Sequence, residues 1–210
     1  MKLLIIGATG GTGRELVKQA LAGGHLVTAL VRNPGKLKIT HPGLRILKGN
    51  VLDRSVIEEA VAVQDAVLSA LGHKKFFIYT SILSEGTKNI ISAMEKHQVK
   101  RLICITSLGI NDSRFKLGLY YTLFVIPVIV FFYFRDKAKQ EKLIRNSNLN
   151  WTIIRPGQLT NGKKRGHYKY GAYVGNYILT KMISRADVAH FMLSQLNDDS
   201  NFKKAVGIVH

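Results

Sequence analysis

A glycine-rich heptad near the start of the chain constrains the fold more than any other feature. It follows the apolar run Lys2–Ile6 and precedes a segment of helical period. The heptad consists of Gly7, Ala8, Thr9, Gly10, Gly11, Thr12 and Gly13. Glycines spaced by three permit a tight turn, a close backbone approach to a pyrophosphate and close packing of helix on strand. Because a helix N-terminus offers free N–H groups, the heptad predicts a dinucleotide site.

Short apolar runs alternate with segments of helical period along the whole chain. The expected strands are Lys2–Ile6, Leu26–Val31, Leu44–Lys48, Ala66–Ser69, Arg101–Thr106, Trp151–Ile154 and Ala205–Val209. The expected helices are Gly11–Ala22, Ser55–Val61, Glu85–His97, Asp136–Asn146 and Ala186–Leu196. This alternation predicts an α/β fold with a mostly parallel sheet. Ligands bind beyond the carboxyl ends of such strands, so the residues that follow each strand are the functional candidates.

The turn after the second expected strand indicates which dinucleotide binds. An NAD site has an acidic residue here, whereas this chain has Arg32 and Asn33, with Lys36 and Lys38 close behind. A guanidinium can clamp a 2′-phosphate and stack on the adenine. The sequence therefore predicts NADP(H) in preference to NAD(H), and a solvated basic turn is the alternative.

The turns after the third and fourth strands complete the expected cofactor site. They contribute Val51, Leu52, Asp53, Ala70, Leu71 and Gly72. Asp53 has two interpretations, because its carboxylate can accept from the adenine amino group or cap the next helix. The small residues at 70–72 would let the backbone run beside the central riboses.

Charge and cysteine content limit the class of protein. The 210 residues include 31 Lys+Arg and 13 Asp+Glu, which gives a net charge of +18 and favours anionic partners. No nucleic-acid recognition motif accompanies this charge, so no specific nucleic-acid partner is expected. Cys104, the single cysteine, lies in an apolar strand and excludes an intramolecular disulfide framework. We expect no metal site and one domain over residues 1–210, with a cytoplasmic location and possible membrane association.

The segment from Leu117 to Phe134 has 18 residues and no charge. This length meets the lower bound for a membrane span, but Pro127 would kink the helix. The expected interpretation is two short segments broken at Pro127, one of them roofing the acceptor pocket. The surplus of apolar surface predicts an interface, with dimerisation or shallow membrane docking as its uses.

The sequence blocks together resemble a known family. GATGGTGR, TALVRNPGKL, GNVLD, DAVLSALG, SEGTKNIISAMEKHQVKRLICITS, DKAKQEKLIRNSNLNWTIIRPG and ISRADVAHFM occur in the order seen in atypical short-chain dehydrogenase/reductases. The NmrA-like, NAD(P)-binding group that includes biliverdin reductase B, a flavin reductase, is the most similar branch. The resemblance implies a doubly wound Rossmann-type sheet of about seven strands in three α/β/α layers. It also implies an NADPH site and, in enzymatic members, hydride transfer.

The resemblance assigns roles around the nicotinamide. Ser107 matches the serine that donates to an acceptor oxygen, although its hydroxyl can instead cap a turn. Lys137 matches the lysine that binds ribose hydroxyls; a solvated lysine is the alternative. Tyr133 lies four residues earlier, so a helix would place both side chains on one face, as in the tyrosine general acid and assisting lysine of typical reductases. The aromatic run at 131–134 also makes this match easy by chance.

Further residues after the fifth and sixth strands complete the predicted site. Thr106 and Pro156 are expected beside the cofactor, and Gln158 and Leu159 toward the substrate. The basic loop at 163–165 would attract an anionic acceptor such as a flavin phosphate, with a solvated loop as the alternative. Ser184 is expected to open a late helix through a capping box.

Three functions remain open from the sequence. The first is an NADPH-dependent reductase of a flavin, a quinone or a carbonyl compound. The second is a redox sensor that binds NADP(H) without turnover and reports to a partner. The third is a reductase at a membrane surface that acts on a quinone-type acceptor. Fold and cofactor transfer between relatives more readily than activity does.

Overall fold

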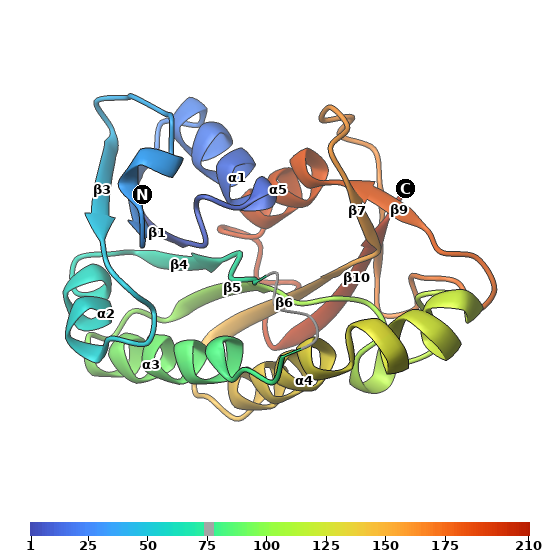
Figure 1. Ribbon diagram of the computed structural model, residues 1–210. Helices are drawn as coiled ribbons and strands as arrows, with labels where there is room; N and C mark the ends of the chain where they lie inside the picture. Colours follow the sequence, from blue (N-terminus) through green and yellow to red (C-terminus); the bar gives the residue numbers. More distant parts are fainter. Residues whose placement is uncertain (74–77) are drawn as a thin grey trace.

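A computed structural model describes residues 1–73 and 78–210, and an eight-stranded sheet forms its centre (Figure 1). The strand order is β3-β2-β1-β4-β5-β6-β10-β8, and all neighbours are parallel except β10 and β8. The parallel strands are β1 (Lys2–Ile6), β2 (Leu26–Val31), β3 (Leu44–Lys48), β4 (Ala66–Ser69), β5 (Arg101–Ile105), β6 (Asn150–Pro156) and β10 (Lys204–Val209). The order reverses between β1 and β4, where doubly wound sheets bind ligands.

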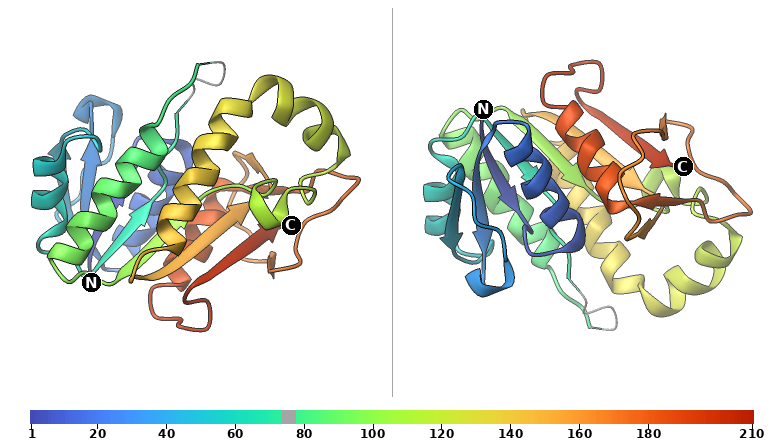
Figure 2. Two further views of the ribbon diagram at one scale, coloured as in Figure 1. Left: turned by 90° about the horizontal axis from the view of Figure 1, so that it is seen from below. Right: turned by 90° about the horizontal axis from the view of Figure 1, so that it is seen from above.

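Helices cover both faces of the sheet, as Figures 1 and 2 show. On one face lie α1 (Gly11–Ala22) and α5 (Arg185–Ser194), which pack on each other. On the other face lie α2 (Arg54–Val61), α3 (Ile82–Lys96) and α4 (Phe131–Arg145). The predicted three-layer α/β/α architecture is confirmed.

Two apolar cores lie between these layers because side chains alternate across each strand. In β1, Leu3 and Ile5 belong to the core beneath α1 and α5. Leu4 and Ile6 belong to the core beneath α2, α3 and α4. Strands buried on both faces therefore read as continuous apolar runs, which is how the sequence located the inner parallel strands. The edge strand β3 was also predicted, although its Arg45, Ile46 and Lys48 are exposed.

The sequence did not predict the short strands β7, β8 and β9. β8 (Lys169–Gly171) adds an antiparallel edge to the main sheet, so the sheet has one strand more than about seven. β7 (Gln158–Thr160) and β9 (Met182–Ser184) form a separate parallel pair. Strands of three residues are too short to show a period.

The apolar segment 117–134 folds as two helices, but the predicted break at Pro127 is wrong. Pro127 lies inside η3, a π-helical segment over Tyr121–Ile129. The chain bends at Val130, whose φ is −115° and ψ 19°, and α4 begins at Phe131. The N–H of Val130 donates to Val125, five residues back, and this wide turn accommodates the proline without ending the helix. In the part of the chain that the structure describes, no helix combines the length and apolarity that a membrane crossing needs.

Candidate functional site

The glycine loop between β1 and α1 leaves no room for side chains. Gly7 has φ of +81°, and a Cβ there would lie 2.4 Å from the carbonyl oxygen of Ala70. A Cβ on Gly13 would lie 2.1 Å from the carbonyl oxygen of Gly7. Gly10 begins α1 without a side-chain cap, and the first turn of α1 contains no acidic residue. The N-terminus of α1 thus keeps its positive potential for an anion, and the loop fits a dinucleotide pyrophosphate.

Other side chains of the loop contribute differently. Ala8 and Thr12 are buried in the protein, whereas Thr9 is half-buried at the carboxyl edge of the sheet. Gly11 lies at the first position of α1. Its predicted cofactor role, like those of the other loop residues, stays a prediction.

Arg185 brings a cation to this loop that the sequence analysis missed. A Cβ on Gly11 would lie 2.5 Å from Cδ and 2.8 Å from Nε of Arg185, so the arginine side chain lies directly on the loop. Its Nη1 donates to Oδ1 of Asn161 at 2.6 Å. The signal in the sequence was the capping box of α5, in which the Ser184 hydroxyl accepts from the N–H of Asp187 at 2.9 Å. Only the packing of α5 on α1 shows that the next residue, Arg185, reaches the glycine loop.

The turn after β2 is basic and exposed. Arg32 is exposed, and Oδ1 of Asn33 accepts from the N–H of Gly35, which caps the short helix η1 (Pro34–Lys36). Arg14, on α1, donates through Nη2 to the carbonyl oxygen of Lys36 at 3.2 Å. Arg14 therefore lies against the basic turn that carries Arg32 and Lys36, and Arg14 was not among the predicted residues.

Asp53 caps α2, which was one of its two predicted roles. Its Oδ1 accepts from the N–H and the hydroxyl of Ser55 and from the N–H of Val56. These bonds, led by the Ser55 hydroxyl, hold the pKa of Asp53 below its usual value. Of its predicted neighbours, Val51 is buried and Leu52 is exposed at the edge. A contact of any of the three with adenine stays a prediction.

Tyr133 and Lys137 lie together, as their spacing on α4 predicted. The ammonium of Lys137 is 5.1 Å from the centre of the Tyr133 ring. Lys137 is only 3% exposed, and none of the described residues forms an ion pair or hydrogen bond with it. An ammonium without a carboxylate partner can donate to a ligand, so this arrangement points to a ligand with hydroxyl or oxygen acceptors.

The hydroxyl of Tyr133 reaches the end of β4. A Cβ on Gly72 would lie 3.4 Å from this hydroxyl oxygen. The predicted cofactor residues Ala70, Leu71 and Gly72 therefore separate the glycine loop from Tyr133. His73, which the sequence analysis did not single out, meets the Tyr133 ring edge-on with centroids 4.9 Å apart. The sequence did not indicate a role for His73, because Tyr133, whose ring it contacts, lies 60 positions further along the chain.

Ser107 and Thr106 follow β5 and differ in their contacts. Ser107 is half-buried, and no described residue forms a hydrogen bond with its hydroxyl. Thr106 is buried, and its Oγ1 donates to Oε1 of Glu141 at 2.6 Å. The Ser107 hydroxyl can therefore serve a ligand, whereas the hydroxyl of Thr106 is committed to the fold. Thr106 can contact a cofactor through its backbone, as can Pro156, whose carbonyl oxygen accepts from the N–H of Leu108.

A buried ionic network fixes the segments around Ser107. Arg155, on β6, donates to Glu141 through Nε at 2.9 Å and through Nη2 at 2.6 Å. It also donates to both carboxylate oxygens of Asp112, at 2.9 and 2.7 Å. The Arg155 bonds lower the pKa of Asp112 to about 2. Glu141 lies on α4, and Asp112 lies in the short helix η2 (Asn111–Ser113). The network therefore joins α4, β6 and η2.

The predicted substrate residues lie apart from this network. Gln158 is exposed on β7, and its N–H donates to the carbonyl oxygen of Lys181. Leu159 is half-buried and packs against the core beneath α1 and α5. The basic loop 163–165 is held on this same face, because Asp187 Oδ1 accepts from the N–H groups of Arg165 and Gly166. Contact of these residues with a substrate stays a prediction.

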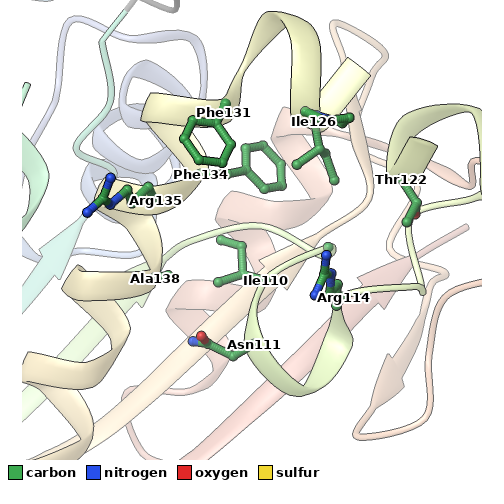
Figure 3. Close-up of a pocket in the computed structure, with 11 residues that line it drawn as sticks. Ile110, Asn111, Arg114, Thr122, Ile126, Phe131, Phe134, Arg135 and Ala138 are labelled. Atoms are coloured by element: carbon green, nitrogen blue, oxygen red, sulfur yellow. The ribbon is translucent and has the colours of Figure 1, made fainter. Parts of the chain in front are cut away.

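A cavity of about 250 Å³ lies between η2, η3 and α4 (Figure 3). Ile110, Ile126 and Phe134 point into it, and Arg114 and Arg135 stand at opposite sides. None of the three residues Ser107, Tyr133 and Lys137 lines this cavity. The apolar segment therefore roofs a cavity on the other side of α4 from Lys137. Its predicted use as the acceptor pocket stays a prediction.

Comparison with known proteins agrees with the site. The sequence pattern of a family described as NAD(P)H-binding matches residues 7–199. The chain belongs to this NAD(P)H-binding family. An uncharacterised chloroplast protein of Arabidopsis thaliana is 30% identical over 225 residues, which cover 99% of this chain and 76% of that protein.

Solved structures of similar fold include relatives named as reductases. ChuY of Escherichia coli O157:H7, described as an anaerobilin reductase, has a TM-score of 0.82 and 24% identity over 100% of this chain and 97% of ChuY. A short-chain dehydrogenase/reductase of Veillonella parvula in complex with NADP has a TM-score of 0.80 and 18% identity over 100% of this chain and 94% of that protein. The resemblance predicted from the sequence blocks is confirmed at the level of family and fold.

Among residues 1–73 and 78–210, no group of three or more His, Cys, Asp or Glu side chains could hold a metal ion. Burial raises the pKa of the Cys104 thiol to about 11, so this cysteine stays a protonated core residue at neutral pH.

Proposed function

We propose that this protein is an NADPH-dependent reductase that transfers hydride to a flavin or to another planar or carbonyl acceptor. The observation that carries the proposal is the pair of Tyr133 and Lys137, placed next to Gly72 on the edge where the glycine loop opens. Membership of the NAD(P)H-binding family supports the cofactor, and the reductase named among the structural neighbours agrees with the reaction type.

Lys137 would bind the hydroxyls of the nicotinamide ribose. Its side chain is almost fully buried and its ammonium lacks a carboxylate partner in the described part of the chain, so ribose oxygens would supply acceptors. The N-terminus of α1 and the guanidinium of Arg185 would hold the pyrophosphate at the other end. These two anchors would place the nicotinamide near the ends of β4 and β5.

The reaction adds one hydride and one proton to the acceptor. Bound NADPH supplies the hydride and is thereby oxidised to NADP⁺. Ser107 donates a hydrogen bond to the acceptor oxygen, and Tyr133 donates the proton to a carbonyl acceptor and recovers it from solvent. A flavin that accepts hydride at nitrogen takes its proton from water, so its reduction does not require Tyr133.

Arg32 would make the site selective for NADPH. Arg14, Arg32 and Lys36 form a basic group beside α1, and no acidic residue lies at this turn to bind a free 2′-hydroxyl. Replacing Arg32 with Asp should weaken NADPH binding by more than tenfold and strengthen NADH binding. Equal loss of affinity for both nucleotides would contradict selectivity through Arg32.

Turnover with a panel of acceptors tests the function. The purified protein should oxidise NADPH in the presence of FMN, riboflavin, a quinone or an aromatic aldehyde. Tyr133→Phe should lower kcat for the aldehyde by about 10²-fold or more and leave flavin reduction unchanged. Tyr173→Phe is the matched control, because this tyrosine is 93% exposed and lies outside the site. Tight NADPH binding without turnover of any acceptor would contradict the proposal and favour a sensor.

A further inference from the structure

One end of the molecule carries a large exposed apolar surface, which we call the apolar tip. Its residues come from η3 with its flanks and from the loop that precedes β9: Leu119, Tyr120, Leu123, Phe124, Val128, Ile129, Tyr177, Ile178 and Leu179. Each is at least 40% exposed, and Val128 and Ile178 reach 70% and 74%. Monomeric proteins rarely keep so many large apolar side chains together in water, which indicates an interaction surface.

The two segments of the apolar tip are held together by backbone contacts. The N–H of Leu119 donates to the carbonyl oxygen of Ile178, and the N–H of Asn176 donates to that of Lys116. The hydroxyl of Thr180 donates to the carbonyl oxygen of Leu117 at 3.0 Å. Figure 2 shows η3 and the orange loop next to each other at one end of the molecule in both views. The tip is therefore one built surface drawn from two parts of the chain.

The unpaired charges that flank the segments of the tip in the sequence are of one sign. Arg114, Lys116, Arg135, Lys139 and Lys181 flank its segments in the sequence, and none of them forms an ion pair with any described residue. Positive charge thus remains unneutralised around an apolar surface.

The acidic residues of this region are committed elsewhere. Between positions 112 and 185 the sequence contains only Asp112, Asp136 and Glu141. Asp112 and Glu141 bind Arg155, and buried Asp136 accepts from the N–H groups of Leu83 and Ser84. No acidic side chain of this stretch is left to balance the cations at the tip.

The apolar surface and the unpaired cations together favour one kind of partner over another. A second copy of the chain, related by a two-fold axis, would bring the same cations face to face and would be repelled. An anionic bilayer surface satisfies both features, because its headgroups attract Lys and Arg while apolar side chains enter the acyl boundary. We propose that the apolar tip docks the protein onto an anionic lipid surface without crossing it.

Docking would also place the cavity of Figure 3 against the lipid. Ile126 belongs to η3 and lines that cavity, and Arg114 and Arg135 belong to both the cavity and the cationic surround. The surface thus joins a membrane contact to a space that can take an amphiphile with an anionic group. The proposal concerns the surface alone and does not depend on the reductase activity.

Sedimentation with vesicles tests the docking. The whole chain should sediment with vesicles of equal parts phosphatidylglycerol and phosphatidylcholine, and at least tenfold more weakly with phosphatidylcholine alone. Added salt should weaken the binding. Equal binding to both kinds of vesicle, or no binding to either, would overturn the proposal.

Matched variants assign the binding to the tip. The double substitution Leu123→Ser and Phe124→Ser should lower vesicle binding at least tenfold, whereas Val63→Ser should not, because Val63 is 57% exposed in the connection between α2 and β4, outside the apolar tip. Arg135→Glu with Lys181→Glu should have a similar effect, and Lys48→Glu with Lys100→Glu, an equal change of charge elsewhere, should have little. NADPH affinity checks that each variant folds.

The same variants expose the competing occupant. If Leu123→Ser with Phe124→Ser leaves vesicle binding unchanged but abolishes a concentration-dependent dimer in analytical ultracentrifugation, a second copy covers the tip and the proposal is wrong. A monomer that loses vesicle binding through the same substitution supports it.

Discussion

Residues 1–72 carry the predicted cofactor residues and residues 107–182 the predicted acceptor residues, and the two regions are held in place by different kinds of contact. In the first region the contacts include local ones, such as Gly13 against the carbonyl oxygen of Gly7 six residues back and Asp53 on Ser55 two residues on. In the second, Arg155 joins Glu141 and Asp112 across segments 14 and 43 residues away. The predicted cofactor side therefore follows from short sequence patterns, whereas the predicted acceptor side depends on a tertiary network.

Removing Glu141 from the buried ionic network should have the largest effect on stability. Glu141→Leu would leave the buried guanidinium of Arg155 with Asp112 alone and should lower the free energy of unfolding by about 3–5 kcal/mol. Urea denaturation measures this loss. Glu59→Leu is the control, because Glu59 forms an exposed ion pair with Arg45 and should cost at most about 1 kcal/mol. If the two variants lost equal free energy of unfolding, the second region would not depend on its buried network as we infer.

A methyl group in the glycine loop tests the cofactor side. Gly13→Ala would place Cβ 2.1 Å from the Gly7 carbonyl oxygen and should cost about 1–3 kcal/mol of stability, with loss of NADPH binding. Gly23→Ala, whose Cβ meets its nearest neighbour at 3.4 Å, should leave NADPH affinity unchanged. Calorimetric titration with NADPH measures both variants. Full affinity in Gly13→Ala would show that the loop can shift to admit a side chain, contrary to the close packing of Gly13 on Gly7.

Arg185 reaches the glycine loop from the C-terminal part of the chain, so its contact tests whether residues outside the first region help to bind the cofactor. Arg185→Gln should weaken NADPH binding about tenfold, or about 1.4 kcal/mol, through loss of a charged phosphate contact. Lys163→Gln removes the same charge from the exposed basic loop and should have a smaller effect. If both substitutions weaken binding equally, only the overall potential matters and Arg185 makes no phosphate contact.

Low pH should have the smallest effect, because it removes only the stability that the ionised Asp112 contributes to the network. The pKa of Asp112 is lowered to about 2, so its contribution to stability is fully present above about pH 4 and is lost as the pH falls toward 2. The side chain of Asp112 is 66% exposed, so solvent screening limits the contribution to about 1 kcal/mol or less. Unfolding of the native chain and of Asp112→Asn at pH 5 and pH 2.5 measures it. A difference between them that persists unchanged at low pH would contradict this titration.

The sequence predicted the parallel sheet and the glycine loop because each is encoded by residues close together. The range Gly11–Ala22 was located to the residue, since a glycine turn opens the helix and Gly23-Gly24 closes it. Arg185, His73 and the Arg155 network could not be found this way. Each becomes part of the site only when segments tens of residues apart pack together, and a lone charged side chain carries no signal of its partner.

The bend at Val130 has a consequence for how this architecture can vary. Because η3 ends there and α4 starts its own hydrogen-bond ladder at Phe131, a residue gained or lost within η3 would not rotate α4 about its axis. Tyr133 and Lys137 would keep facing Gly72 while the exposed tip changed length and composition. Insertions and deletions among related chains should therefore accumulate before position 130 and stop at α4, so that evolution can retarget the outer surface without disturbing the chemistry beneath it.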